Sequence, residues 1–200
     1  MKSVKVFGVL AGLGVMAAAG VGATALMASP SAATASSAVA PGGAIDGVHS
    51  SVVFKVKHMN KANFYGVFKD VSGSFSLDGE DASKSSIDVT VKADSIDTRN
   101  GGRDNHAKSA DFLSAKEFPT ITFKSTSVKK GAGEKAFDVT GDLTFRGVTK
   151  PVLVKVTQSD DAGKGMEATF SIKRSDFGNS SQAGKGLSDE VDFIVALEAK

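Results

Sequence analysis

The sequence of 200 residues contains no cysteine and no tryptophan. Without cysteine the chain cannot form disulfide bonds, a thiolate metal site or a cysteine nucleophile, and it cannot carry the acylated cysteine of a lipoprotein. The folded part must therefore be stabilised by an ordinary hydrophobic core. The 13 phenylalanines are the main candidates for that core.

A strong excess of charge is also absent. Lys and Arg together number 24, and Asp and Glu number 22. Two of the lysines, Lys2 and Lys5, lie in the first forty residues, which contain no acid, so the rest of the chain is balanced. Nucleic-acid-binding domains usually carry a clustered basic surface. The balanced charge therefore argues against a nucleic-acid partner.

Catalytic motifs are missing as well. The sequence contains no nucleophile elbow, zinc-protease helix, Walker loop or dinucleotide-binding glycine motif. The three histidines, His49, His58 and His106, match no standard zinc spacing. The apolar strand faces carry no pair of carboxylates for acid–base chemistry. We therefore predict no catalytic residue, no metal site, no cofactor and no enzymatic activity.

The first 43 residues are typical of a targeting segment. Residues 1–5 are positively charged, residues 6–28 are apolar and uncharged, and residues 29–43 are small and polar. This layout predicts a signal peptide over 1–28, cleaved somewhere between 25 and 40, followed by a flexible linker over 29–43. The alternative is an uncleaved anchor, because a membrane span needs about 20 residues. Membrane contact would then be transient or made through the uncleaved signal.

From residue 44 onward, apolar and polar side chains alternate with a period of two, which predicts β-strands with one buried face. Turn residues such as Asp78-Gly79 and Arg146-Gly147 separate the runs. About eight strands with short connections predict an all-β antiparallel barrel or sandwich in one domain, 44–200. The alternating runs lie within 52–56, 67–77, 87–91, 121–123, 137–145, 152–156, 166–172 and 191–197.

One segment interrupts this pattern. Residues 94–119 are too many for a tight hairpin and contain the loop-forming Asn100-Gly101-Gly102. We expect a short helix within 104–117, ended by Pro119 and placed as a cap over one end of the barrel.

Seven phenylalanines lie on the apolar strand faces. A small barrel can be filled by its own side chains, but an eight-stranded barrel can also hold one ligand. Because few polar side chains share these faces, a bound ligand would be long and apolar. The predicted lumen residues are Phe54, Val56, Phe75, Val89, Ile121, Phe123, Phe170 and Phe193. The weaker candidates for contact with a polar headgroup are His58, His106 and Arg146.

Several motifs in sequence order resemble the YceI family. His49-Ser50-Ser51-Val52-Val53-Phe54 is similar to the first strand of that family, and Arg103-Asp104-x-His106 is similar to its loop and helix. The most distinctive stretch runs from Gly141 to Val152, with Phe145-Arg146-Gly147-Val148-Thr149-Lys150-Pro151 at its centre. The likeness covers residues 45–199. Gly43, where the family often has an aromatic residue, and Ala107, where it often has leucine, depart from the pattern.

This resemblance implies a lipocalin-like antiparallel barrel, exported to the periplasm, that holds a polyisoprenoid or quinone-like lipid in its lumen as a carrier or scavenger. Two other functions stay open at this point. One is a lipid-modifying enzyme that uses His58 or His106 as a base. The other is a filled barrel that binds a protein partner, and a homodimer is possible in either case.

Overall fold

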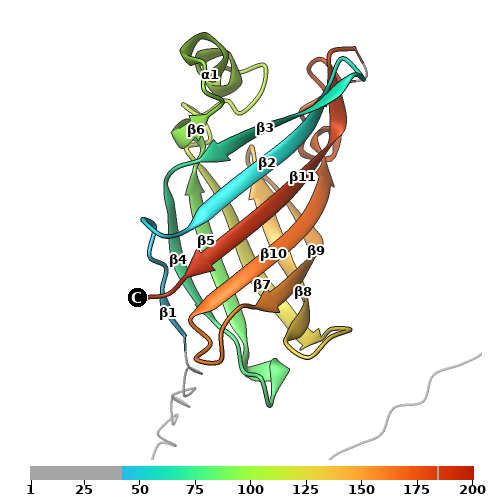
Figure 1. Cartoon of the computed structure of the whole chain (residues 1–200). Coiled ribbons are helices and arrows are strands. Elements are labelled where there is room, and N and C mark those ends of the chain that lie inside the picture. The colour runs from blue at the N-terminus through green and yellow to red at the C-terminus, as the bar shows by residue number, and fades with distance from the viewer. Residues whose placement is uncertain (1–41, 184) are drawn as a thin grey trace, which may run out of the picture. The chain divides into compact units, whose positions relative to one another are not determined.

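The computed structural model describes residues 42–183 and 185–200. The predicted signal peptide and most of the predicted linker lie outside these residues. In the described part, eleven antiparallel strands form one curled, barrel-like sheet (Figure 1). The order of the strands across the sheet is β1-β4-β5-β7-β8-β9-β10-β11-β2-β3-β6.

Most of the strands are joined by short connections, as the turn residues predict. The strands are β1 (Gly42–Ala44), β2 (Ser51–His58), β3 (Ala62–Phe68), β4 (Val71–Ser76), β5 (Ser86–Lys92), β6 (Ile96–Asp97), β7 (Thr120–Lys130), β8 (Ala136–Phe145), β9 (Val148–Gln158), β10 (Gly165–Lys173) and β11 (Leu187–Glu198). The helices are α1 (Gly101–Lys108) and the 3₁₀ turns η1 (Ala82–Lys84), η2 (Ala93–Ser95) and η3 (Arg174–Phe177).

The prediction of an all-β antiparallel fold is confirmed, but the predicted count of about eight strands is wrong. The run over 67–77 is two strands, because β3 pairs with β2 whereas β4 pairs with β5. Phe68 and Val71 are both buried although they are three positions apart in the sequence. Side chains three residues apart in one regular strand point to opposite faces, so the chain must break between them. The strands β1 and β6, of three and two residues, had no alternating pattern to reveal them.

The edge strand β1 is hydrogen-bonded to the last residues of the chain. The amide of Asp46 donates to the carbonyl oxygen of Glu198 at 2.8 Å, and the amide of Lys200 donates to that of Ala44 at 2.9 Å. Near β1 the sheet therefore curls back onto β11. The C-terminus lies near β1, and α1 lies at the opposite end of the sheet (Figure 1).

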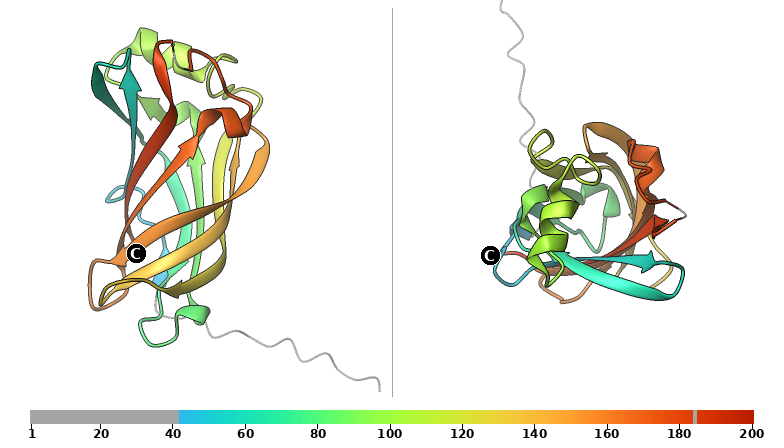
Figure 2. Two further views of the ribbon diagram at one scale, coloured as in Figure 1. Left: turned by 90° about the vertical axis from the view of Figure 1, so that its right-hand side faces the viewer. Right: turned by 90° about the horizontal axis from the view of Figure 1, so that it is seen from above.

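The helix lies earlier than the expected 104–117. Asn100 caps it, since its side-chain oxygen accepts a hydrogen bond from the Arg103 amide at 3.0 Å. An asparagine in this position satisfies an otherwise unpaired amide of the first turn, which outweighs the poor helix propensity of Gly101 and Gly102. Seen from this end, α1 lies across the mouth of the curled sheet (Figure 2), which agrees with the expected cap. None of the described helices has the length and hydrophobicity that crossing a membrane requires.

Glycines in the strands make room for aromatic rings on the inner face. A Cβ built on Gly141 of β8 would lie 2.4 Å from Cζ of Phe123 and 2.6 Å from the carbonyl oxygen of Lys124. A Cβ built on Gly66 of β3 would lie 2.3 Å from Cζ of Phe54. The two rings can occupy these positions only because each lies against a backbone that has no side chain.

We predict that Gly141→Ala destabilises the protein by about 1–3 kcal/mol, because the added methyl group overpacks the Phe123 ring and meets a backbone oxygen that cannot rotate away. Urea unfolding followed by circular dichroism measures the change. Gly79→Ala is the control, since a Cβ at Gly79 has no neighbour within 4 Å. Equal stability of the two variants would contradict the role assigned to Gly141.

Candidate ligand-binding lumen

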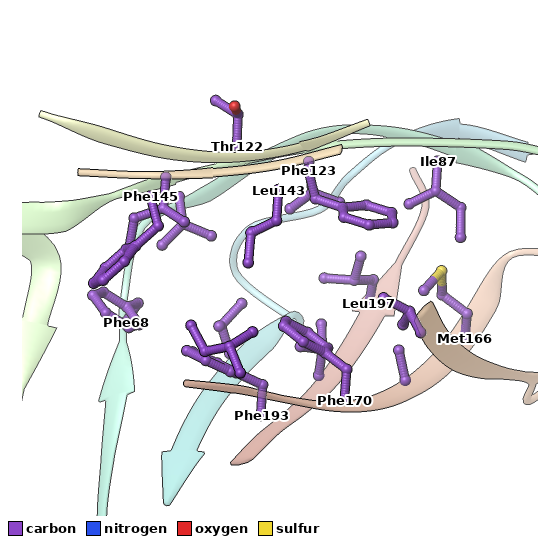
Figure 3. Close-up of a pocket in the computed structure, with 18 residues that line it drawn as sticks. Phe68, Ile87, Thr122, Phe123, Leu143, Phe145, Met166, Phe170, Phe193 and Leu197 are labelled. Atoms are coloured by element: carbon purple, nitrogen blue, oxygen red, sulfur yellow. The ribbon is translucent and has the colours of Figure 1, made fainter. Parts of the chain in front are cut away.

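The middle of the curled sheet encloses a small chamber with an entirely apolar surface and a free volume of about 70 Å³. We call it the inner chamber. Its lining residues come from eight strands (Figure 3). Phe123 and Leu143 point from one wall toward Phe170 and Phe193 on the other, while Thr122 points away (Figure 3). Side chains fill most of this space, so a ligand that enters it must displace some of them.

Phe170 and Phe193 form one wall of the inner chamber. They are directly opposite each other on β10 and β11. Their rings are stacked, with centroids 4.9 Å apart and planes 11° from parallel. Phe193 also lines the second cavity. The two rings together therefore form a flat apolar surface that leads from one cavity to the other.

The second cavity, here called the outer chamber, lies beneath α1 and has a volume of about 360 Å³. Pockets for small molecules typically measure about 300–1,000 Å³. Four residues line both chambers, which are therefore adjacent: Phe68, Phe145, Ile172 and Phe193. The outer chamber has an apolar floor and wall, built by residues such as Phe54, Val56 and Leu187, and a polar rim under the helix.

Nine of the eleven predicted site residues line one of these chambers. Val89, Ile121, Phe123 and Phe170 line the inner chamber, Phe54, Val56, His58 and His106 line the outer chamber, and Phe193 lines both. Phe75 lines neither chamber and is only 2% exposed, packed in the core near β1. The binding roles of all these residues stay predictions.

Arg146 also lies outside both linings. Its Nη1 donates hydrogen bonds to the carbonyl oxygens of Ala110, at 3.0 Å, and of Phe112. Both carbonyls belong to the turns that follow α1. In this structure Arg146 therefore anchors the cap to the β8–β9 hairpin instead of facing the lumen.

Sequence reasoning missed several lining residues. In a single strand over 67–77, Phe68 would lie on the face opposite to Phe75, so this run gave no reason to choose Phe68. Phe64 and Phe112 lie in segments where no alternating run was recognised. Arg103 belongs to a motif that supported the family resemblance, but no pattern indicated that Arg103 or Arg174 lines a cavity. The buried Arg174 is visible only when the fold brings η3 beside the cap.

Arg103 is held at the rim by neutral groups. Its Nε donates to Thr98 Oγ1 at 2.9 Å, and its Nη2 donates to the Thr98 carbonyl oxygen at 2.7 Å. The Thr98 hydroxyl in turn donates to Asp104 at 2.5 Å. The guanidinium lies over the ring of Phe64, 4.4 Å from its centroid, which is close enough for a cation–π interaction.

Arg174 is the most deeply placed charged residue of the outer chamber, since it is only 6% exposed. Its Nε and Nη2 donate to the carbonyl oxygen of Ser188 at 3.1 and 2.9 Å. Its Nη1 donates to Asn179 Oδ1 at 3.2 Å and to the Ser181 carbonyl oxygen at 3.0 Å. Burial lowers the pKa of this guanidinium, and the nearby Asp189 opposes that shift only in part.

The two histidines at the rim are exposed. His106 Nε2 lies 3.2 Å from Asp111 Oδ2, and its ring meets the Phe112 ring edge-on at 4.9 Å. Asn179 connects η3 to the same turn, because its Nδ2 donates to the Phe112 carbonyl oxygen at 2.8 Å. Over residues 42–183 and 185–200, no three His, Asp or Glu side chains are grouped so as to hold a metal ion.

A single antiparallel sheet curled around an apolar lumen, with polar side chains gathered under a helical cap, defines a lumen-forming β protein. The model of the YceI-like domain matches residues 44–199, and the chain belongs to this family. The predicted family is therefore confirmed. Protein YceI of Escherichia coli O157:H7 is 42% identical over 174 residues, which cover 82% of this chain and 90% of that protein.

Solved structures support the same fold. The crystal structure of BcnA from Burkholderia cenocepacia has a TM-score of 0.71 at 28% identity and covers 78% of this chain and 99% of that one. A polyisoprenoid binding domain from Saccharophagus degradans, implicated in plant cell wall breakdown, has a TM-score of 0.59 at 16% identity. That match covers 80% of this chain and 99% of the other. At 16% identity the second likeness concerns the fold alone.

We predict that Arg146→Met loosens the cap without unfolding the sheet. Methionine keeps an apolar stem but removes two hydrogen bonds to carbonyl oxygens, each worth about 1–3 kcal/mol for a charged donor. Hydrogen–deuterium exchange of residues 109–118 should become at least about tenfold faster. Lys150→Met on the same hairpin is the control, because its ion pair with Asp176 is exposed and 4.0 Å long. Unchanged exchange in Arg146→Met would contradict the anchoring role.

A second prediction concerns acid. The Ser175 hydroxyl and then its amide, which donate to the two carboxylate oxygens of Asp189, hold the pKa of Asp189 below its ordinary value. The stabilisation from these hydrogen bonds is therefore complete at a pH above the pKa of Asp189 in the unfolded chain, about 3.9. It is lost as the pH falls through the lower pKa of Asp189 in the folded protein. Asp189→Asn mimics the protonated acid. Its unfolding midpoint should lie at a lower urea concentration than that of the wild type at pH 7, and at the same urea concentration near pH 2. A difference that persists at pH 2 would refute this assignment.

Proposed function

We propose that this protein is an exported, non-catalytic carrier that holds one isoprenoid-like lipid in its two adjacent chambers. The observation that carries this proposal is the pair of adjacent chambers, of which the inner one has a wholly apolar surface and the outer one combines apolar walls with polar groups gathered near α1 and η3. A ligand with an apolar tail and a polar head matches this distribution. Burial of the tail would be favourable by about 25 cal/mol per Å² of apolar surface.

The family and the fold support a lipid ligand. The solved domain from Saccharophagus degradans, which shares the fold, is described as polyisoprenoid binding. The signal-like composition of residues 1–28 supports export to the periplasm. A carrier role fits better than catalysis, since among the described residues no carboxylate side chain lines either chamber, and the carboxylate that pairs with the lining histidine His106, that of Asp111, is exposed to solvent.

The extent of the free space favours a ligand that occupies the outer chamber and inserts its tail between the phenylalanines of the inner chamber. The outer chamber alone lies within the usual range for a small ligand. The inner chamber, at about 70 Å³, needs movement of side chains such as the stacked Phe170 and Phe193 before it can hold a tail. Branched, flexible chains suit a lumen whose walls are bulky rings.

The direct test is to express the full chain in an exporting bacterial host, purify it without detergent, extract it with organic solvent and analyse the extract by mass spectrometry. We expect an isoprenoid or related amphiphile in roughly stoichiometric amount. Phe193→Asp should abolish this co-purification, because a carboxylate would lie in both chambers and oppose burial of an apolar tail.

Ile194→Asp is the matched control. Ile194 follows Phe193 on β11, is 47% exposed on the outer face, and should tolerate a charge with no loss of lipid. Circular dichroism would show that both variants keep the sheet. An empty extract from folded wild-type protein that also fails to take up added isoprenoids would refute the carrier proposal and favour a filled barrel with a protein partner.

A further inference from the structure

The charged and titratable groups of the outer chamber are all basic. Its lining includes Arg103, Arg174, His58 and His106, and among the described residues it includes no Asp or Glu. Residues 1–41 and Gly184 cannot supply a carboxylate side chain, because that part of the sequence contains no acid. The lining itself therefore carries only basic groups, while Asp111 lies behind it against His106 and Asp104 behind it on the Thr98 hydroxyl.

Arg174 is a buried charge that makes no direct ion pair in the described residues. All four of its hydrogen bonds go to neutral oxygens, from the carbonyls of Ser188 and Ser181 and from the side chain of Asn179. The nearby Asp189 uses both carboxylate oxygens to accept hydrogen bonds from Ser175. Taking a charge out of water is unfavourable unless an opposite charge compensates it, so the chamber gains most from an anionic occupant.

Arg103 also lacks an acidic partner, because none of the ion pairs found in the described residues includes it or Arg174. A guanidinium has five N–H donors. The hydrogen bonds described above use four donors of Arg174 and two of Arg103. Both side chains therefore keep donors available for an oxyanion, and the planar fork of arginine suits phosphate and carboxylate oxygens.

We propose that the outer chamber is an anion site, in which Arg174 and Arg103 bind the phosphate or carboxylate headgroup of an amphiphile. This proposal rests on the proposed function and narrows it, since it selects anionic ligands over neutral ones such as quinones or alcohols of equal chain length. A neutral head could accept hydrogen bonds from the same donors but would leave the charge of Arg174 uncompensated. Arg103 lies on α1 and Arg174 on η3, so a headgroup bound by both side chains would link these two helical segments.

The test uses the full chain, stripped of lipid, and three probes measured by isothermal titration calorimetry: farnesyl monophosphate, farnesol and inorganic phosphate. We expect farnesyl monophosphate to bind at least about tenfold more tightly than farnesol, a difference of about 1.4 kcal/mol. Inorganic phosphate should bind far more weakly than farnesyl monophosphate, because it lacks the tail. Equal binding of inorganic phosphate would overturn the assignment of the anion to a lipid headgroup.

Charge-removing variants locate the site. Arg103→Gln should weaken the binding of farnesyl monophosphate about tenfold and change the affinity for farnesol by less than about twofold, since the lost interaction is with a charged group. Arg174→Gln should act in the same direction, and Arg103→Gln keeps the test valid if Arg174→Gln fails to fold. Arg99→Gln is the control, because Arg99 lies four residues from Arg103 and does not line the chamber.

The failures of the two proposals differ. Equal affinity for farnesyl monophosphate and farnesol, or an equal loss of both in Arg103→Gln, would overturn the anion site and leave lipid binding intact. If neither prenyl probe binds the wild-type chain, the carrier function is overturned. The proposed headgroup site is then overturned as well, because it depends on lipid binding. As a second readout, farnesyl monophosphate but not farnesol should slow amide exchange in residues 101–108.

Discussion

A single curled sheet has no second layer, so each inward-facing side chain must be covered by the opposite wall of the same sheet. At the end near β1 this requirement is met completely, and Phe75, Phe137 and Val139 are at most 2% exposed there. At the α1 end the same alternation of apolar residues leaves the outer chamber, with a volume of about 360 Å³. The lumen is thus the part of the core that the sheet cannot fill from its own inner face.

The shape of the lumen depends on where the rings can lie. Gly66 and Gly141 give Phe54 and Phe123 positions close against the backbone of a neighbouring strand, which keeps both rings out of the centre. Phe170 and Phe193 instead stack on each other across β10 and β11. Phe54 thus lies at the wall of the outer chamber and Phe123 at the wall of the inner one, whereas the stacked pair of rings takes up part of the inner chamber.

The sequence predicted the parts that follow from local periodicity. The strands β2, β5 and β7 to β11 lie where alternation placed them, and nine of the eleven proposed site residues line the lumen because the inner face follows from the same alternation. Prediction failed where tertiary pairing decides the structure. The break between Phe68 and Val71 reflects a change of partner strand, and the position of Arg174 depends on carbonyls from a later loop that no periodic pattern can locate.

The polar rim shows how the fold keeps a charge available instead of neutralising it. Asp189 is close enough to Arg174 to act on its pKa, yet Ser175 takes up the carboxylate oxygens. Carbonyl oxygens of Ser181 and Ser188 and the side chain of Asn179 hold the guanidinium in place without cancelling its charge. Such an arrangement is unfavourable in an empty chamber but needs little reorganisation when an anion enters, because the donors are already fixed. The same hydrogen bonds order the loop between η3 and β11, so the groups that position the charge also close one side of the cap.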